Sequence, residues 1–304
     1  MADPREITRA LRGKWYGGYG LCFCPAHDNT RTPALTVATG RDGRLLLSCK
    51  AGCSFVDVLD ALRGLGLVEG SGRMPEVDHA ELVRRDAEAK ARRDAGIAKA
   101  SALWDSASLF KGSLAERYLL ARAIRAEGQR ALRFHPRCPL GRERRPAMVA
   151  AVVTEGEGIT GVHRTCLSEP GIKAPDLGHS AKRMLGICAG GATRLLAGDG
   201  PLLVGEGIES SFSAGAHIAS ERPTVWAALS APGMKTLRLP AVAGTLIIAP
   251  DAEPAGQAAA SALAHRAHAS GWTVELMPPP EGCGDWNDHA VSQGSQQSQG
   301  CCHA

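Results

Sequence analysis

The sequence has no apolar run that approaches the ~20 residues needed to cross a bilayer. Its first residues, MADPREITRALRGKWYG, lack the apolar core of a signal peptide. No P-loop motif is present, so a nucleotide-driven motor of that type is not expected. Aromatic residues make up only 4% of the chain, which argues against an extended base-stacking surface. We therefore expect a cytoplasmic protein with no membrane partner.

The composition is that of an ordinary globular protein of 304 residues, with 44% apolar and 22% charged residues. The net charge of +4 conceals an asymmetry. Residues 1–195 carry 31 Lys and Arg against 21 Asp and Glu, whereas residues 196–304 carry 4 against 10. A basic front and an acidic back suit a polyanion bound by one part and cations bound by the other, although unequal solvation of two domains gives the same pattern.

Ten cysteines would suggest disulfides in a secreted chain, but no secretory context is present. Four residues instead form a C-x2-H and a C-x3-C pair separated by 21 residues: Cys24, His27, Cys49 and Cys53. The pairs are separated by the strand-like segments ALTVAT and RLLLSC, so they can converge as tetrahedral zinc ligands. Cys22 is a competing ligand, and reduced, buried cysteines with an incidental histidine are the alternative.

A helix with a Ser54 N-cap is predicted directly after this cluster, over SFVDVLDALRGLGL. The expected N-terminal fold is therefore a zinc ribbon closed by a helix. Four protein ligands leave no position for a substrate, so the zinc should be structural.

The middle of the chain begins with a charged segment, residues 70–100, which predicts an exposed helix or a connector. Two short helices are expected within 101–124, and PAMVAAVVTEGEGITGVHRTCL predicts a hairpin. Four basic residues on its second strand and the following loop are candidates to bind phosphates or a nucleic-acid strand: Arg164, Lys173, Lys182 and Arg183.

The last third alternates apolar strands with helices, which indicates a small parallel α/β sheet. Ligands of such sheets gather at the carboxyl ends of the strands. Five carboxylates fall there: Glu206, Asp251, Glu253, Asp285 and Asp288. Because they repel one another unless a cation intervenes, they predict a Mg²⁺ or Mn²⁺ site; acidic helix caps without a common site are the alternative.

The segments VGEGIES, LIIAPDAEPAG and GCGDWNDH together resemble the toprim domain of DNA primases, topoisomerases and related nucleases. The zinc-ligand cluster and the basic segment ahead of them resemble the order of domains in primases of phage and plasmid type. The resemblance implies a multidomain α+β protein whose C-terminal α/β domain has a small parallel sheet. The expected parts are a zinc-ribbon DNA-binding domain (1–69), a charged linker or helix (70–100), a basic α+β subdomain (101–195), a toprim catalytic domain (196–290) and a disordered tail (291–304).

The resemblance also implies an activity, the synthesis of short RNA primers on single-stranded DNA by metal-dependent nucleotidyl transfer. Glu206, Asp251 and Glu253 would be catalytic, and ribonucleoside triphosphates the substrates, in the replication of a phage, plasmid or other mobile element. Unwinding would require a separate replicative helicase, since no P-loop is present. The alternatives are a toprim nuclease and a non-catalytic, zinc-dependent DNA-binding replication protein.

The acidic pair departs from the family pattern in one residue. The second member is Glu253 where the family usually has aspartate, and Pro254 follows it. The glutamate keeps the charge, but its carboxylate reaches about one C–C bond farther, so the metal geometry must adjust.

Overall fold

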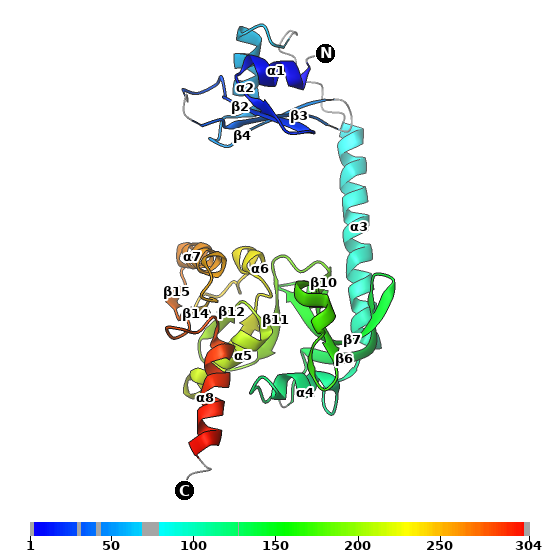
Figure 1. The fold of residues 1–304 in the computed structure, drawn as a ribbon, viewed down its shortest axis with the longest axis vertical. Coiled ribbons are helices and arrows are strands. Elements are labelled where there is room, and N and C mark those ends of the chain that lie inside the picture. Colours follow the sequence, from blue (N-terminus) through cyan, green and yellow to red (C-terminus); the bar gives the residue numbers. More distant parts are fainter. Residues whose placement is uncertain (1–2, 29–31, 41–43, 69–78, 127, 301–304) are drawn as a thin grey trace. The chain divides into compact units, whose positions relative to one another are not determined.

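The computed structural model describes residues 3–28, 32–40, 44–68, 79–126 and 128–300 (Figure 1). It divides into two compact units, residues 1–84 and 85–304. Part of the expected linker, residues 70–78, and the last four residues lie outside the described residues. No helix in the described part of the chain is long and apolar enough to span a membrane.

The first unit is a four-stranded antiparallel sheet with two helices. The elements are α1 (Pro4–Ala10), β1 (Lys14–Trp15), β2 (Tyr19–Cys22), β3 (Leu35–Thr39), β4 (Leu45–Cys49) and α2 (Phe55–Gly64), and the strand order is β1-β2-β3-β4. Strand β3 alternates, so that Leu35 and Val37 point inward and pack with Ile7, Val58 and Leu62. This alternation fixes the register of the sheet, because a one-residue slip would expose the apolar face.

Helix α2 begins where the sequence predicts. Ser54 is its N-cap and accepts a hydrogen bond from the Asp57 amide, while the Asp57 carboxylate accepts one from the Ser54 amide, each at 3.2 Å. This capping box satisfies two backbone donors at once and sets the start of the helix immediately after Cys53.

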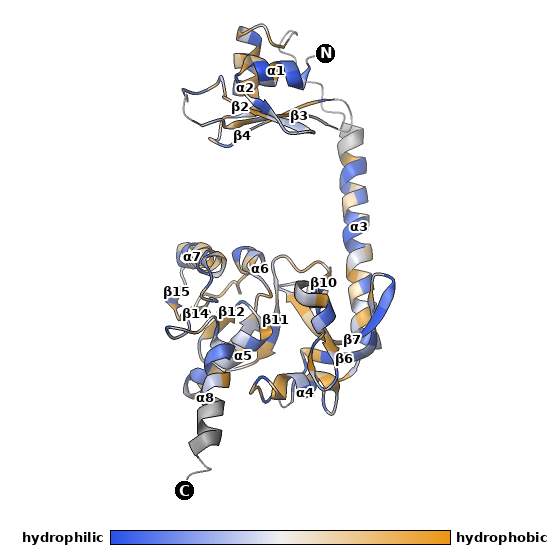
Figure 2. Ribbon diagram, in the orientation of Figure 1, coloured by the Kyte–Doolittle hydropathy of each residue, from blue (hydrophilic) through white to orange (hydrophobic). Residues whose placement is uncertain are grey.

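The division between the units falls within the long helix α3 (His79–Ser106), most of which belongs to the second unit. Its exposed turns are mostly hydrophilic (Figure 2). Only its last turns are buried, where Ala100, Leu103 and Trp104 pack on the sheet. Trp104 is fixed further by Arg133, which lies over its ring at 4.3 Å and donates to its carbonyl oxygen at 2.7 Å. The first of the two short helices expected within 101–124 is therefore the end of α3; the second is α4 (Leu114–Leu120).

One continuous sheet runs through this unit. Its antiparallel part contains β5 (Ser108–Leu109), β6 (Leu132–Leu140), β7 (Glu143–Thr154), β8 (Gly158–Ser168), β9 (Ile172–Lys173) and β10 (Lys182–Gly186), with a 3₁₀ turn (Pro175–Ala181) before β10. Strands β7 and β8 form the predicted hairpin. Strand β11 (Gly191–Leu196) then pairs with the end of β7 and with β13, so the segments expected as separate domains, 101–195 and 196–290, share backbone hydrogen bonds.

The remaining strands form the predicted parallel sheet. They are β12 (Leu202–Gly205), β13 (Thr224–Ala227), β14 (Thr245–Ala249) and β15 (Thr273–Leu276), in the order β13-β12-β14-β15. Helices α5 (Ile208–His217), α6 (Ala231–Thr236), α7 (Pro254–Ala269) and α8 (Trp286–Gly300) accompany them, with a short 3₁₀ turn (Ala219–Glu221). The strands read as apolar runs because both faces of a parallel sheet are covered.

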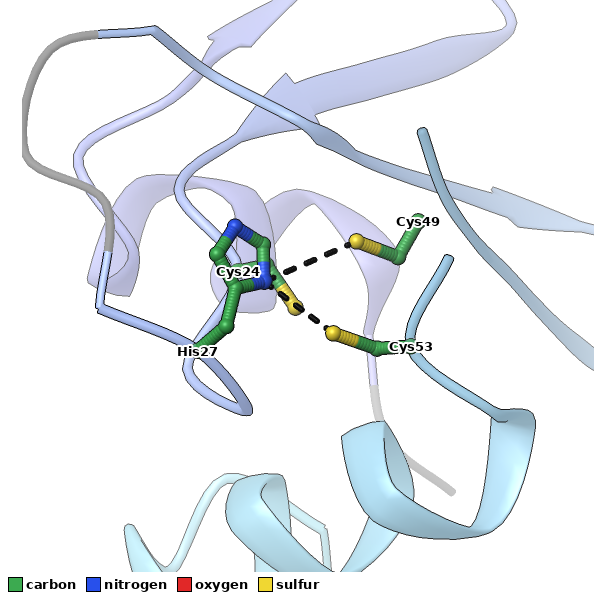
Figure 3. Close-up of side chains that lie close together, drawn as sticks. All are labelled: Cys24, His27, Cys49 and Cys53. Carbon is green, nitrogen blue, oxygen red and sulfur yellow. Dashed lines mark hydrogen bonds between the residues drawn. The ribbon is translucent and has the colours of Figure 1, made fainter. Parts of the chain in front are cut away.

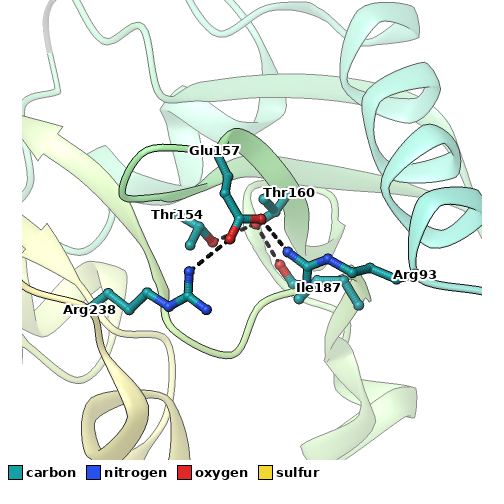
Figure 4. A network of polar contacts seen from close by, with 6 residues as sticks. All are labelled: Arg93, Thr154, Glu157, Thr160, Ile187 and Arg238. Atoms are coloured by element: carbon teal, nitrogen blue, oxygen red, sulfur yellow. Dashed lines mark hydrogen bonds and ion pairs between the residues drawn. The ribbon is translucent and has the colours of Figure 1, made fainter. Parts of the chain in front are cut away.

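A polar network ties the tip of the β7–β8 hairpin to its neighbours (Figure 4). Glu157 in the turn pairs with Arg93 of α3 and, at 2.8 Å, with Arg238 after α6. Beneath it the hydroxyls of Thr154 and Thr160 lie 2.7 Å apart. These contacts connect α3, the hairpin and the parallel part of the unit through one carboxylate.

The tail differs from the sequence expectation. Helix α8 continues to Gly300, so residues 291–300, expected to be disordered, are helical. The helix starts from a firmly packed first turn, since Trp286 and Asn287 are buried and no proline interrupts the residues that follow. Residues 301–304 lie outside the described residues.

Candidate functional site

The four predicted metal ligands converge at one end of the first unit (Figure 3). Cys24 follows β2, Cys49 ends β4 and Cys53 precedes α2. The Nδ1 atom of His27 lies 3.1 Å from Cys53 Sγ and 3.7 Å from Cys49 Sγ. All four donor atoms lie within 4.8 Å of one another, and in the described part of the chain no other such group of His, Cys, Asp or Glu occurs.

The backbone and the chemistry of this group both fit a metal ion. Gly52, with φ of +90°, turns the chain back so that Cys53 faces Cys49. Burial raises the pKa of Cys24 to about 12, so a cation is needed to hold this side chain as the thiolate. Three thiols and an imidazole are the donor set typical of a closed, structural zinc site. The group could therefore hold a zinc ion.

Cys22, the competing ligand, is not part of this group. It is fully buried in the core of the first unit, and its Sγ lies 3.6 Å from the Leu35 carbonyl oxygen. Cys22 is the last residue of β2, whereas Cys24 lies beyond the end of that strand, in the turn that leads to His27.

The same unit exposes a small aromatic hairpin between β1 and β2. Tyr16 and Tyr19 stack at 5.6 Å between ring centroids and are 49% and 45% exposed. Lys14 lies 5.7 Å from the Tyr16 ring, and Arg5 lies 5.3 Å from the ring of Trp15. The low aromatic content of the sequence does not reveal that Tyr16 and Tyr19 stack here beside Lys14.

The carboxylates of the second unit gather at the carboxyl ends of β12 and β14. Gly205 and Ala249 pair at the ends of these parallel strands, which brings Glu206 and Asp251 to one edge. A Cβ atom at Gly256 would lie 3.1 Å from Glu206 Oε2 and 2.9 Å from the Asp251 carbonyl oxygen. The first turn of α7 can approach both residues only because residue 256 is glycine.

The electrostatics of this edge favour a cation. Burial, followed by the negative charges of Glu206 and Asp285, raises the pKa of Asp251 to about 7. Burial, together with the negative charge of Glu253, raises the pKa of Glu206. The Ala231 amide donates a hydrogen bond to this carboxylate and partly offsets the rise. Asp251 Oδ1 is buried without a hydrogen-bond partner. A buried acceptor among like charges is a position that a divalent cation would satisfy.

Glu253 and Asp285 are placed by helix starts. Glu253 is the N-cap of α7 but makes no side-chain cap hydrogen bond, and Pro254 restricts it to an extended backbone. The negative charge of the Glu253 carboxylate raises the pKa of Glu206. Asp285 accepts the Asp288 amide at 2.8 Å at the start of α8. Asp288 lies in the first turn of α8, and its Oδ2 atom would lie 2.9 Å from a Cβ atom at Gly284.

The four predicted basic residues divide between the two faces of the antiparallel strands. Lys182 lowers the pKa of Glu206 and Asp251, and the pKa of Lys173 responds to Asp285, so these two lysines lie beside the acidic edge. Arg183 is the neighbour of Lys182 on β10 and is opposite Arg164 on β8, so both arginines are on the other face. Arg164 is buried there and donates to the carbonyl oxygens of Pro139 and Met184.

Sequence reasoning missed Glu209, which is 3% exposed and links the two halves of the unit. Its carboxylate pairs with Lys182 at 3.0 Å and accepts the Tyr118 hydroxyl at 2.5 Å. Burial alone would raise the pKa of Glu209, but Lys182 and Tyr118 together lower it to about 2. A charged residue on the otherwise buried face of α5 was the signal that could have identified it.

Comparison with known proteins identifies the C-terminal part. Residues 201–296 match the model of the toprim domain, and residues 94–195 match a family described as a domain of unknown function (DUF7146). No curated protein matches the chain. The chain thus carries a toprim domain, as the sequence predicts, in a mixed α+β fold with a parallel C-terminal sheet and an N-terminal Cys/His cluster.

Two solved structures are similar to this fold. The zinc-binding and RNA polymerase domains of the Aquifex aeolicus primase are 14% identical, over 97% of this chain and 81% of that chain, with a TM-score of 0.39. The primase fragment of the bacteriophage T7 primase-helicase protein is 13% identical, over 92% of this chain and 98% of that chain, with a TM-score of 0.38.

The buried Glu209 pair predicts a pH-dependent contribution to stability. Because the pKa of Glu209 falls from an ordinary 4.5 to about 2 on folding, its contribution is complete above pH 4.5 and is lost as the pH falls toward 2. We expect Glu209→Gln to lower the free energy of unfolding by about 2 kcal/mol at pH 7. Urea denaturation should show this difference shrinking below pH 4.5.

Glu221→Gln is the matched control, since Glu221 is exposed and forms no ion pair among the described residues. It should match the wild type at every pH. A Glu209→Gln variant as stable as the wild type at pH 7 would contradict the assigned pair.

Proposed function

We propose that this protein is a DNA primase that synthesises short RNA primers on single-stranded DNA. The observation that carries the proposal is the toprim match over residues 201–296 together with the gathering of Glu206, Asp251, Glu253 and Asp285 at one sheet edge. Replication of a phage, plasmid or other mobile element, in the cytoplasm and with a separate helicase, is the context we propose.

The acidic residues have a defined task in this reaction. Asp251, Glu206, Glu253 and Asp285 would hold Mg²⁺ or Mn²⁺, which when bound neutralises triphosphate charge and assists deprotonation of the attacking hydroxyl. Asp251 is preorganised for this by its unpartnered Oδ1. The Ala231 amide holds Glu206 in place. Asp288, in the first turn of α8, would support this group by donating its backbone amide to the Asp285 carboxylate.

Lys173 and Lys182 would hold the nucleotide and the template strand beside this edge. Lys182 is oriented by buried Glu209, and its side chain is still 38% exposed. Because Glu209 holds the Lys182 ammonium group in position beside the other carboxylates, this group can still bind a phosphate. We do not assign Arg164 and Arg183 to this contact, since they lie on the opposite face of β8 and β10.

The first unit would bind template DNA. A zinc ion held by Cys24, His27, Cys49 and Cys53 would stabilise the ends of β2 and β4 and the start of α2. The tyrosine pair Tyr16 and Tyr19, flanked by Lys14, supplies ring faces and positive charge, the combination that binds single-stranded nucleic acid without strict sequence preference.

A toprim nuclease would use the same carboxylates to hydrolyse phosphodiesters, and a non-catalytic DNA-binding protein would use the zinc unit alone. The unpartnered Oδ1 atom of Asp251 favours a working cation site over a non-catalytic protein. A zinc unit and paired lysines ahead of the toprim domain favour synthesis over hydrolysis.

Priming can be measured directly with single-stranded DNA, Mg²⁺ or Mn²⁺ and labelled ribonucleotides. We expect short RNA products that fall at least ~100-fold in Glu206→Gln and Asp251→Asn, because each removes a charge that holds the cation. Asp285→Asn should reduce synthesis more than Asp288→Asn. Exposed Glu275 on β15 provides the control Glu275→Gln, which should be fully active.

Shortened DNA without RNA products would identify a nuclease. DNA binding with neither product would favour the non-catalytic protein.

The metal content of the purified protein tests the zinc cluster. Elemental analysis should find about one zinc per chain. Cys49→Ser should lose it, because three ligands hold zinc far more weakly than four, whereas Cys22→Ala should keep it, because Cys22 is a core residue. The assignment fails if zinc persists in Cys49→Ser.

Template binding tests the aromatic hairpin. Tyr16→Ala with Tyr19→Ala should weaken binding of an oligo-dT strand by ~10-fold or more, since base stacking on an aromatic side chain contributes ~1–3 kcal/mol. Phe replacements at both positions keep the ring faces and should bind as the wild type does in fluorescence anisotropy. Equal affinity of the Ala and Phe variants would show that the rings do not contact DNA.

A further inference from the structure

A cavity with mostly apolar walls and several basic side chains lies on the other face of the antiparallel strands, between the last turns of α3 and strands β6, β7, β8 and β10. Its volume is about 710 Å³, within the range of small-molecule sites. Apolar walls come from Leu103, Pro139 and Leu185. The remaining chemistry is basic, since four of its lining residues are Lys99, His135, Arg144 and Arg164 and no carboxylate is among them.

Arg164 is the most unusual of these residues. It is only 9% exposed, and in the described part of the chain no carboxylate lies within ion-pairing distance of it. Its two terminal nitrogens donate to the carbonyl oxygens of Pro139 and Met184 at 2.7 and 3.0 Å, while its Nε has no partner. A buried guanidinium that is fixed in place but not neutralised is costly unless an anion compensates it.

The neighbouring groups add donors rather than counter-charges. Lys99 and Arg144 are exposed at the cavity and form no ion pair within the described residues. The Nδ1 atom of His135 accepts the Arg137 amide at 3.0 Å, which leaves the ring proton of a neutral imidazole on Nε2. Burial and then Arg144 lower the pKa of His135, so the ring stays neutral at pH 7. The cavity therefore offers cations and a neutral donor without an acceptor carboxylate.

This cavity is distinct from the acidic edge. Arg164 is on the face of β8 that packs toward α3. Lys182 is on the opposite face, where it pairs with Glu209. Alternation along β8 and β10 separates the two sites by the thickness of the sheet.

We propose that this cavity is a separate binding site for a small phosphate ester with a flat ring, such as a nucleoside diphosphate. Arg164, Arg144 and Lys99 would receive the phosphates, and the flat group would lie against Leu103 and Leu185. The site goes beyond the proposed priming reaction, because it shares none of the carboxylates or lysines assigned to that reaction.

Fluorescently labelled ADP provides the probe, titrated into the full chain without added divalent ions so that the acidic edge repels it. We expect saturable binding that weakens at least ~10-fold in the double variant Lys99→Glu with Arg144→Glu, and that unlabelled ADP, but not adenosine, displaces. Lys90→Glu with Arg92→Glu reverses the same charges on the outer part of α3 and should bind as the wild type does. Lys182→Ala, which disables the proposed priming contact, should also retain this binding.

Three results would overturn the proposal. One is equal affinity of the wild type and the Lys99→Glu, Arg144→Glu variant. Another is ADP binding that is lost only in Lys182→Ala. The third is binding of a 5′-phosphorylated oligo-dT strand that depends on Lys99 and Arg144 while ADP does not bind, since this would make the cavity a contact for a nucleic-acid strand.

Discussion

The parallel pairing of β12 with β14 is the constraint on which the acidic site depends. Strands that run in the same direction end at the same edge, so the residues that follow Gly205 and Ala249 meet although 45 positions separate Glu206 from Asp251. Burial of the strands on both faces holds this register, because a slip would move the apolar residues out of two cores at once. Gly256 then admits α7 close to both carboxylates.

Gathering carboxylates in this way raises their pKa values and would destabilise the edge without compensation. The second unit supplies positive charge from outside the parallel sheet, through Lys182 on β10. Buried Glu209, held by Tyr118 of α4, binds that lysine in turn. One glutamate thus couples the antiparallel strands to the acidic edge, in the same unit where Glu157 couples the hairpin to α3 and to Arg238. Both contacts join segments that match two different families.

Strand alternation gives the antiparallel strands two different chemical faces. The face of Lys182 lies toward the carboxylates, and the face of Arg164 lies under α3 around a basic cavity. The four basic residues predicted together from the sequence therefore lie on two faces, because successive side chains of a strand point to opposite sides: Lys173 and Lys182 on one, Arg164 and Arg183 on the other. A charge count cannot detect this division, because it depends on the register between β8 and β10.

The sequence by itself determined the local features. Cys-x2-His and Cys-x3-Cys spacing identified the four side chains that could hold a metal ion, the Ser54 cap marked the start of α2, and the apolar runs ahead of Glu206 and Asp251 marked two of the parallel strands. Spacing and periodicity suffice there because the interacting groups are close in the chain or share a strand end. Tertiary structure alone decided that Cys22 belongs to the core, that Glu209 holds Lys182, and that Arg164 faces away from the carboxylates. Each of these depends on which face of a strand or helix meets a partner far away in the sequence, and that is set by the packing of the whole sheet.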